Sequence, residues 1–358
     1  MIPYILNIFV MILFAVILLW ENPNKWKKIV FCILVSLQWT IISGFRHISI
    51  GSDTYSYKAY FFDKTLNIPW HILLKDFINI IFYGDLGKDP GYILFEKFFQ
   101  VFSDEYQLYL IFIASIFTFS LGVWIYKNSS EPFLSFLIYV CLFFSFFGIT
   151  GHRQTIATAL VVLIGYKFIK DKKFWPFFIL VIIGSTLHKS ALIFLVFYFM
   201  ANKKITKKYL GIMSLLITLV FLFKNQIIIF VGTLSGYDSY IDQFEGAGTW
   251  IFTAALILVA LVTFWKRKAM MSNNSQVTHY INAILIALLL VPLTFVDPSA
   301  MRVVQYFSLF LLLLIPEIIK TFSSWERTII YYSVAVLLIL LFAKNNPQYL
   351  FFWEGIMF

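Results

Sequence analysis

The chain has 358 residues, of which 61% are hydrophobic, 20% aromatic and only 13% charged. Globular proteins carry about a quarter charged residues, so this composition excludes a soluble protein and indicates an integral membrane protein. The net charge of +10 arises mainly from short lysine clusters between apolar runs. That pattern is typical of cytoplasmic loops rather than of a nucleic-acid surface.

The apolar runs predict an all-α, polytopic membrane protein with about 12 transmembrane helices (11–13) in a single domain over residues 1–358. Because the lysine clusters mark the cytoplasmic side, twelve crossings leave both termini outside. The first run has no basic leader and no cleavage site, so we expect it to be retained. The expected spans are residues 3–20, 29–45, 106–126, 132–149, 153–169, 174–187, 190–201, 209–224, 250–265, 279–296, 303–316 and 328–343.

Residues 174–201 are the most ambiguous part of this threading, because lysine clusters flank them on both sides. Two helices of about 14 residues reach only about 21 Å, so the break at residues 185–190 is expected below the outer surface. Polar backbone at that depth requires a cavity or protein partners. A single tilted span is the alternative, and it would invert every later loop.

Two segments are expected outside the membrane. Residues 46–105 form a large external loop with interfacial helices at 68–83 and 91–102, which are too short or too charged to span. Residues 225–249 form a second external loop, with Tyr237, Asp238, Tyr240, Asp242 and Glu245.

Several charged residues gather at the outer ends of the expected spans: Arg46, Arg153, His188, Lys189 and Arg302, with Asp53 and Asp297. An ionisable group at membrane depth costs roughly 2.5–3.5 kcal/mol, so such a set predicts a water-filled cavity. Arginine also favours paired contacts with phosphate oxygens. Each residue has an alternative interpretation: Asp53 and Asp297 as helix caps, Arg153 as a snorkelling cation, and His188 as a packing residue.

Four segments occur in a recognisable order: FRHISIGSDTYSYKAYF (45–61), DPGYILFEKFFQVF (89–102), TGHRQTIATALVVLIGYKFI (150–169) and STLHKSALIFLVFY (185–198). Together they resemble the EpsG-like branch of the Wzy-type bacterial polysaccharide polymerases. The matching residues are Arg46, Gly51, Asp53 and Tyr57 in the first, Asp89, Gly91 and Tyr92 in the second, Arg153 and Gln154 in the third, and His188, Ser190 and Ala191 in the fourth. The similarity covers roughly the first 200 residues, and Arg302 has no motif behind it.

The resemblance implies a GT-C-like polymerase in the bacterial plasma (inner) membrane, with its active site facing the outside or periplasm. Its substrates would be polyprenyl-pyrophosphate-linked oligosaccharides, as donor and acceptor. The growing glycan would pass to the incoming unit with release of polyprenyl pyrophosphate. A flippase and a chain-length regulator are the implied partners, beside membrane lipid. The resemblance thus points to the biosynthesis of a surface polysaccharide, such as O-antigen, lipopolysaccharide, capsule or exopolysaccharide.

The chemistry of the reaction assigns roles to the outer-face residues. The leaving diphosphate gains negative charge, so Arg153 and Arg46 are expected to hold it, with Arg302 as a third cation. His188 is favoured as the base because imidazoles exchange protons near neutral pH, with Asp53 orienting the acceptor, although Asp53 remains an alternative base. Tyr57, Tyr92, Asp89, Gln154 and Lys189 complete the predicted substrate-binding set.

No cofactor and no metal are predicted, since the aspartates are scattered and the two cysteines lie in apolar runs. Two other functions stay open at this point. A flippase or transporter of lipid-linked sugars would show matching halves with charges at mid-membrane, and the sequence has neither. A membrane acyltransferase would need a histidine near its cytoplasmic donor, where only His279 is found.

Overall fold

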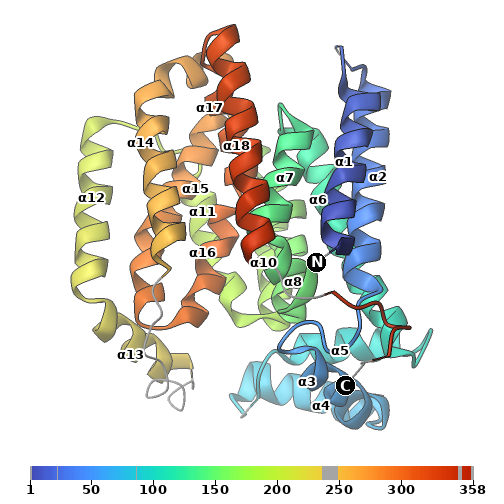
Figure 1. Ribbon diagram of the computed structural model, residues 1–358. Helices are drawn as coiled ribbons and strands as arrows, with labels where there is room; N and C mark the ends of the chain where they lie inside the picture. Colours follow the sequence, from blue (N-terminus) through green and yellow to red (C-terminus); the bar gives the residue numbers. More distant parts are fainter. Residues whose placement is uncertain (1, 22, 86, 236–248, 346–348, 356–358) are drawn as a thin grey trace. The chain divides into compact units, whose positions relative to one another are not determined.

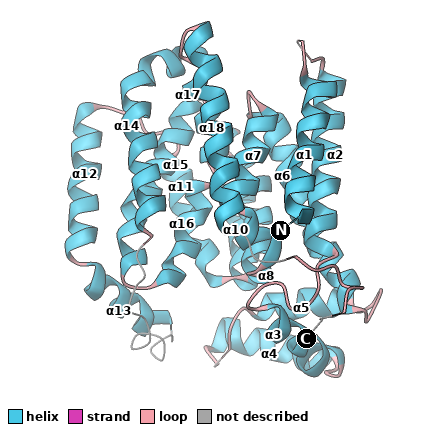
Figure 2. Ribbon diagram, viewed as in Figure 1, coloured by secondary structure: helices cyan, strands magenta, loops and turns pink. Residues whose placement is uncertain are grey.

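The computed structural model describes residues 2–21, 23–85, 87–235, 249–345 and 349–355. Within these ranges the chain is helical, and its one strand-like pairing is an isolated bridge between Arg46 and Phe351 (Figure 2). The chain divides into two compact units, Met1–Leu192 with Tyr332–Phe358, and Ile193–Tyr331. The all-α prediction is therefore confirmed.

The first unit holds most of the predicted site. Its helices, including π-helical segments at η1, η2, η3 and η4, are α1 (Ile2–Leu19), α2 (Lys25–Gly44), α3 (Thr54–Tyr60), η1 (Phe61–Leu66), α4 (Trp70–Ile78), η2 (Asn79–Tyr83), α5 (Pro90–Phe99), α6 (Tyr106–Asn128), α7 (Pro132–Leu142), η3 (Ser145–Ile149), α8 (His152–Thr158), η4 (Ala159–Ile164), α9 (Tyr166–Lys170) and α10 (Phe174–Leu187) (Figure 1).

The second unit is also helical. They are α11 (Leu195–Met200), α12 (Lys207–Leu222), α13 (Lys224–Ser235), α14 (Trp250–Asn273), α15 (Val277–Leu290), η7 (Val291–Phe295), η8 (Pro298–Ala300), α16 (Met301–Ser308) and α17 (Leu311–Lys320). Two further helices contain the unit boundaries, η5 (Lys189–Phe194) and α18 (Ser324–Asn345).

Six of the described helices are long and apolar enough to cross a membrane, or up to eight if two bent pairs each form one span. The bends are 75° between α12 and α13, and 51° between α16 and α17. The protein is thus a multi-pass membrane protein. The number of twelve crossings stays a prediction, because several expected spans contain shorter helices.

The expected spans at 132–149 and 153–169 are interrupted in the structure. Helix α7 ends at Leu142 after 11 residues, and a π-helical segment follows at Ser145–Ile149. The path from His152 to Lys170 passes through a second π-helical segment, η4, before α9. The residues at these breaks are mostly apolar, so hydropathy alone gives no signal for them.

The two predicted interfacial segments are helical. Residues 68–83 contain α4 and η2, and residues 91–102 contain most of α5. In the predicted second external loop, residues 225–235 belong to α13, whereas residues 236–248, with all five of its named tyrosines and acids, lie outside the described residues.

Helices α2 and α6 pack closely through small polar residues. Ser36 Oγ donates to the Thr118 carbonyl at 3.0 Å, and the hydroxyls of Thr40 and Thr118 are 2.5 Å apart. Such residues let membrane helices approach one another. The end of α2, which leads directly into Arg46, is thereby held against α6.

The C-terminal segment also holds the end of α2 and the residues that follow it. The Phe352 N–H donates to the Phe45 carbonyl at 2.9 Å, and the His47 N–H donates to the Leu350 carbonyl at 2.8 Å. Tyr349 Oη donates to the Ile42 carbonyl at 2.8 Å. Residues 349–352 therefore run along the segment 45–47 and cover Arg46.

Candidate functional site

Asp89 is the centre of a buried ionic cluster. Its side chain is 3% exposed, and its carboxylate accepts three hydrogen bonds. Arg153 Nη1 lies 3.2 Å from Oδ2, His188 Nδ1 lies 3.4 Å from Oδ2, and the Lys189 backbone N–H donates to Oδ1 at 3.1 Å. Segments that are 64 and about 100 residues apart in the chain meet at this one carboxylate.

The backbone at Asp89 explains how the carboxylate reaches this position. Asp89 has φ 51° and ψ 53°, in the left-handed region that aspartate and asparagine tolerate better than most other residues. Pro90 then occupies the first position of α5, where its fixed φ suits a helix start. The Asp-Pro pair therefore turns the chain sharply into α5.

Gly91 allows α5 to lie directly against the end of α10. A Cβ atom at Gly91 would be 2.1 Å from Thr186 Oγ1 and 2.9 Å from the Thr186 carbonyl carbon. No larger residue fits without separating the two helices, and Asp89 would then move away from His188. The acid-x-Gly-aromatic motif is thus explained by packing as well as by chemistry.

His188 lies where α10 ends. Its backbone is extended, with φ −159° and ψ 112°, and its N–H donates to the Gly184 carbonyl at 2.9 Å. The break expected within residues 185–190 falls at this residue. Because a carboxylate only accepts, Nδ1 carries the hydrogen that faces Asp89. The other ring nitrogen, Nε2, is buried and has no hydrogen-bond partner among the described residues.

Arg153 enters the cluster from the first turn of α8, after Gly151 with φ 64°. Its guanidinium carbon lies 5.5 Å from the centre of the Tyr57 ring, 5.9 Å from Tyr60 and 5.4 Å from Tyr92. Such cation–π contacts are worth about 0.5–1 kcal/mol each at exposed sites. The side chain remains 22% exposed, so part of its donor fork is accessible to a ligand.

Arg46, by contrast, is engaged by the protein itself. It is 2% exposed, and it donates to the carbonyls of Ser43 and Ile149, the latter at 3.0 Å. Its Nη2 also lies 2.8 Å from His152 Nε2. The predicted contact of Arg46 with a substrate stays a prediction.

The electrostatics of the cluster favour an ionised Asp89. Burial by itself raises the pKa of this carboxyl, but the hydrogen bond with His188, the charge of Arg153 and the Lys189 amide outweigh burial, so the pKa lies below its usual value. The carboxylate therefore balances the charge of Arg153.

Glu96 is a second buried carboxyl, one helical turn after Tyr92 on α5. It is fully buried, and Thr65 Oγ1 donates to its Oε2 at 3.0 Å. Burial raises the pKa of Glu96 to about 7. The sequence analysis did not identify Glu96, although its i+4 spacing from Tyr92 placed it on the same face of the helix.

The structure brings together six of the ten predicted site residues: Asp89, Arg153, His188, Tyr57, Tyr92 and the backbone of Lys189, whose side chain is exposed. Arg46 reaches the same cluster through His152. Gln154 follows Arg153 in the sequence, and its side chain is buried. The sequence analysis also missed His152, although it stands in the quoted segment next to Arg153.

The other two predicted residues are Asp53 and Arg302. Asp53 is half-buried at the start of α3, makes no side-chain capping bond, and accepts from Ser52 Oγ at 3.4 Å. Arg302 belongs to the second unit. Asp297 in that unit accepts from the Ser299 N–H at 2.8 Å, as expected of a helix cap. Residues 2–21, 23–85, 87–235, 249–345 and 349–355 contain no group of three or more His, Cys, Asp or Glu side chains placed to hold a metal ion.

Helices that can cross a membrane, together with the ionic cluster that Asp89, Arg153 and His188 form, define a multi-pass membrane protein with a buried polar site. The sequence model of the EpsG family matches residues 28–354. The chain therefore belongs to the EpsG family, which is a family of Wzy-like polymerases. The match extends far beyond the first 200 residues that carry the four motifs. No curated protein and no solved structure gave a match.

Proposed function

We propose that the protein is a glycosyltransferase that polymerises polysaccharide repeat units carried on polyprenyl pyrophosphate, at the outer face of the bacterial plasma membrane. Membership of a polymerase family supports this role. The observation that carries the proposal is the buried Asp89 carboxylate, which contacts Arg153 and His188 at once. One anion thus fixes both a cation for a leaving group and a base for an acceptor.

In the proposed step, the acceptor hydroxyl oxygen attacks the anomeric carbon of the donor glycan. The hydroxyl proton passes to His188 Nε2, which Asp89 leaves unprotonated by holding the ring hydrogen on Nδ1. The bond between the anomeric carbon and the phosphate oxygen breaks, and its electron pair leaves with the polyprenyl diphosphate. His188 then releases its proton to solvent or to the diphosphate.

Arg153 stabilises the diphosphate as its negative charge increases. Its partial exposure and its single short contact with Asp89 leave donors for phosphate oxygens. Loss of such a preorganised donor costs about 2.7–4 kcal/mol, or 10² to 10³ in rate. Roles for Arg46, Arg302, Asp53, Gln154 and Lys189 in binding the substrate remain part of the proposal.

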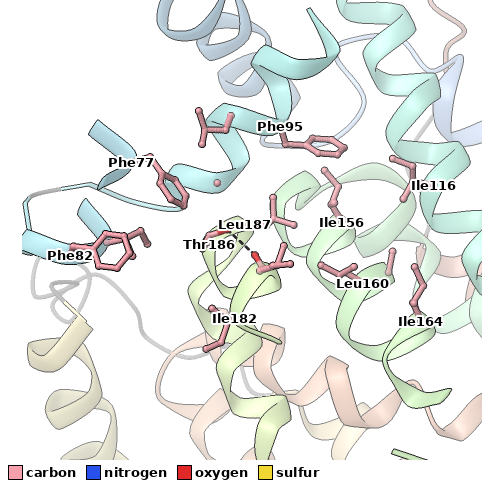
Figure 3. Close-up of a pocket in the computed structure, with 15 residues that line it drawn as sticks. Phe77, Phe82, Phe95, Ile116, Ile156, Leu160, Ile164, Ile182, Thr186 and Leu187 are labelled. Atoms are coloured by element: carbon pink, nitrogen blue, oxygen red, sulfur yellow. Dashed lines mark hydrogen bonds between the residues drawn. The ribbon is translucent and has the colours of Figure 1, made fainter. Parts of the chain in front are cut away.

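An apolar cavity beside the cluster supports a lipid-linked substrate. It has a volume of about 680 Å³, and its walls come from α4, η2, α5, α6, α8, η4 and α10. Figure 3 shows Phe77 and Phe82 on one side and Ile156, Leu160 and Ile164 on the other. Gly91, Thr186 and Leu187 line it within two residues of Asp89 or His188. Ligand sites of about 300–1,000 Å³ are typical, so the cavity can take part of an isoprenoid chain whose diphosphate lies at Arg153.

A deletion of the gene tests the proposal against its two alternatives. If the protein is a polymerase, its loss leaves a surface glycan of single repeat units. If it is a flippase, no repeat units reach the surface, and if it is an acyltransferase, the chains are full-length but lack an ester. Complementation with Arg153→Ala should give single units, whereas Lys204→Ala, a change in an exposed lysine of the second unit, should restore long chains at matched protein levels. Full-length glycan with Arg153→Ala would remove Arg153 from the site.

A further inference from the structure

His152 lies between the two arginines of the first unit. Its ring is 97% buried, Arg46 Nη2 is 2.8 Å from its Nε2, and Arg153 follows it in the chain. The Tyr57 ring is stacked on the His152 ring, with the ring centres 4.4 Å apart and the two planes inclined by 20°. His152 therefore touches one arginine directly and the other through a tyrosine.

The contact with Arg46 determines the tautomer of His152. A guanidinium only donates hydrogen bonds, so Nε2 must be the acceptor and cannot carry a hydrogen. The neutral ring then carries its hydrogen on Nδ1. This bond also fixes the plane of the ring, because Arg46 is itself held by the carbonyls of Ser43 and Ile149.

The ring plane of His152 is transmitted to the diphosphate-binding residue. The Tyr57 ring stacks on the His152 ring, and the Arg153 guanidinium carbon lies 5.5 Å from the centre of the same tyrosine ring. The Tyr57 and Tyr92 rings are 5.7 Å apart, so two of the three aromatic neighbours of Arg153 belong to this packing. A rotation of His152 would shift Tyr57 and change the position of the guanidinium.

Packing alone does not account for this pair. Arg46 Nε and His152 Nδ1 are buried without a partner among the described residues, and an unpaired buried polar group costs about 1–3 kcal/mol. Apolar residues of similar volume often stabilise a protein as well as buried charged groups do, or better. A polar pair that carries such a cost is better explained by the orientation that it imposes.

We propose that His152 is a positioning residue for Arg153: Arg46 fixes its tautomer and ring plane, and its ring holds Tyr57 beneath the guanidinium. The inference rests on the proposed function, in which Arg153 receives the diphosphate. Arg46 then acts on the reaction through His152.

The test compares changes at two tyrosines of α3 with a change at His152 on α8. Tyr57→Leu removes the stacked ring without changing the buried Arg46–His152 pair, and Tyr55→Leu is its control, because Tyr55 is on the same helix and 52% exposed. His152→Gln keeps an acceptor for Arg46 but removes the ring. Each full-length variant in lipid nanodiscs is assayed for binding of inorganic pyrophosphate by calorimetry and for kcat and KM with a lipid-linked donor.

We expect Tyr57→Leu and His152→Gln to lower kcat/KM by roughly 10- to 100-fold, since small misplacements in an active site have effects of this size. Tyr55→Leu should remain close to the wild type. In an Arg153→Lys background, the same two changes should cost less than about threefold further, because residues that act through one group are not additive.

Additive losses in both backgrounds, or a wild-type value for Tyr57→Leu, would overturn the inference, since a merely structural role lowers activity equally in each background. Failure of the proposed function has a different signature. In that case the wild-type protein itself neither binds pyrophosphate nor extends a glycan, whatever residue stands at position 57 or 152.

Discussion

Substitution of Asp89 by asparagine separates the charge of the cluster from its shape. Asparagine has nearly the volume of aspartate and also tolerates the left-handed backbone, here φ 51°, so α5 should begin as before. What is lost is the negative charge between Arg153 and His188. Alanine would be a poorer choice, because it adds about 1–2 kcal/mol of strain at a positive φ.

The expected cost in stability follows from burial. Breaking a fully buried ion pair costs about 3–5 kcal/mol, and hydrogen bonds to charged groups contribute about 1.5–3 kcal/mol. Asp89 is 3% exposed but Arg153 is 22% exposed, so water compensates part of the loss on the arginine side. We therefore expect Asp89→Asn to lower the free energy of unfolding by about 2 kcal/mol.

The effect on turnover should be larger than the effect on folding. An amide can donate to His188 Nδ1 as well as accept from it, so Nε2 is no longer kept free of hydrogen. In the serine-protease triad, a change of this kind lowers kcat about 10⁴-fold because the histidine adopts the wrong tautomer. The bond here is longer, at 3.4 Å, so we expect a loss of about 10²- to 10⁴-fold in kcat for Asp89→Asn.

The assay is single-turnover extension of a lipid-linked glycan by the purified protein, with thermal unfolding of the same sample. Asp85→Asn is the matched control, because Asp85 is exposed and four residues earlier in the same loop. A folded Asp89→Asn protein that extends glycan at the wild-type rate would refute the assignment of Asp89 and His188 to one catalytic unit.

Three further changes test the surroundings of the cluster. The folded protein keeps a proton on Glu96 up to about pH 7, whereas the unfolded chain releases it near pH 4.5. The free energy of unfolding should therefore fall by about 3 kcal/mol as the pH rises between these two values. Glu96→Gln should abolish this slope in chemical unfolding titrations. Gly91→Ala should lower turnover by about 10-fold or more by separating α5 from α10, and Thr186→Ala should restore only part of it, since the Thr186 carbonyl carbon remains 2.9 Å from the new Cβ. Ala159→Phe should fill the apolar cavity and raise KM by roughly 10-fold for donors with long isoprenoid chains, with little effect on short-chain donors; equal KM values for both donors would exclude the cavity as the chain site.

Hydropathy predicted the long helices well. The expected spans at 3–20, 29–45, 106–126 and 328–343 lie within a few residues of α1, α2, α6 and α18. These helices need only a run of apolar residues, which is a local property of the sequence. The prediction was less accurate at 132–149, where α7 ends at Leu142, just before the apolar pair Phe143-Phe144, which gives no hydropathy signal for a break.

The candidate site was predicted by residue type but not by contact. The motifs selected Asp89, Arg153 and His188, yet only the fold shows that the first of these joins the other two. The sequence analysis assigned the orienting role to Asp53, and the structure shows that the buried carboxylate beside His188 is Asp89. Contacts across 64 to about 100 residues have no signal in one sequence, and neither does the pairing of residues 349–352 with 45–47.

The two arginines of the first unit show how burial divides residues that a sequence treats alike. Arg46 and Arg153 both stand at the outer end of an expected span, and either guanidinium could bind two phosphate oxygens. Arg46 is 2% exposed and its Nη atoms already donate to carbonyls and to His152, so binding a ligand would require those bonds to be broken. Arg153 keeps 22% of its side chain exposed and makes one ion pair, so it can gain contacts without losing them. The difference predicts that a change at Arg153 lowers kcat directly, by the roughly 10² to 10³ expected for a lost donor to the leaving group, whereas a change at Arg46 lowers kcat less, because it acts through His152 and Tyr57.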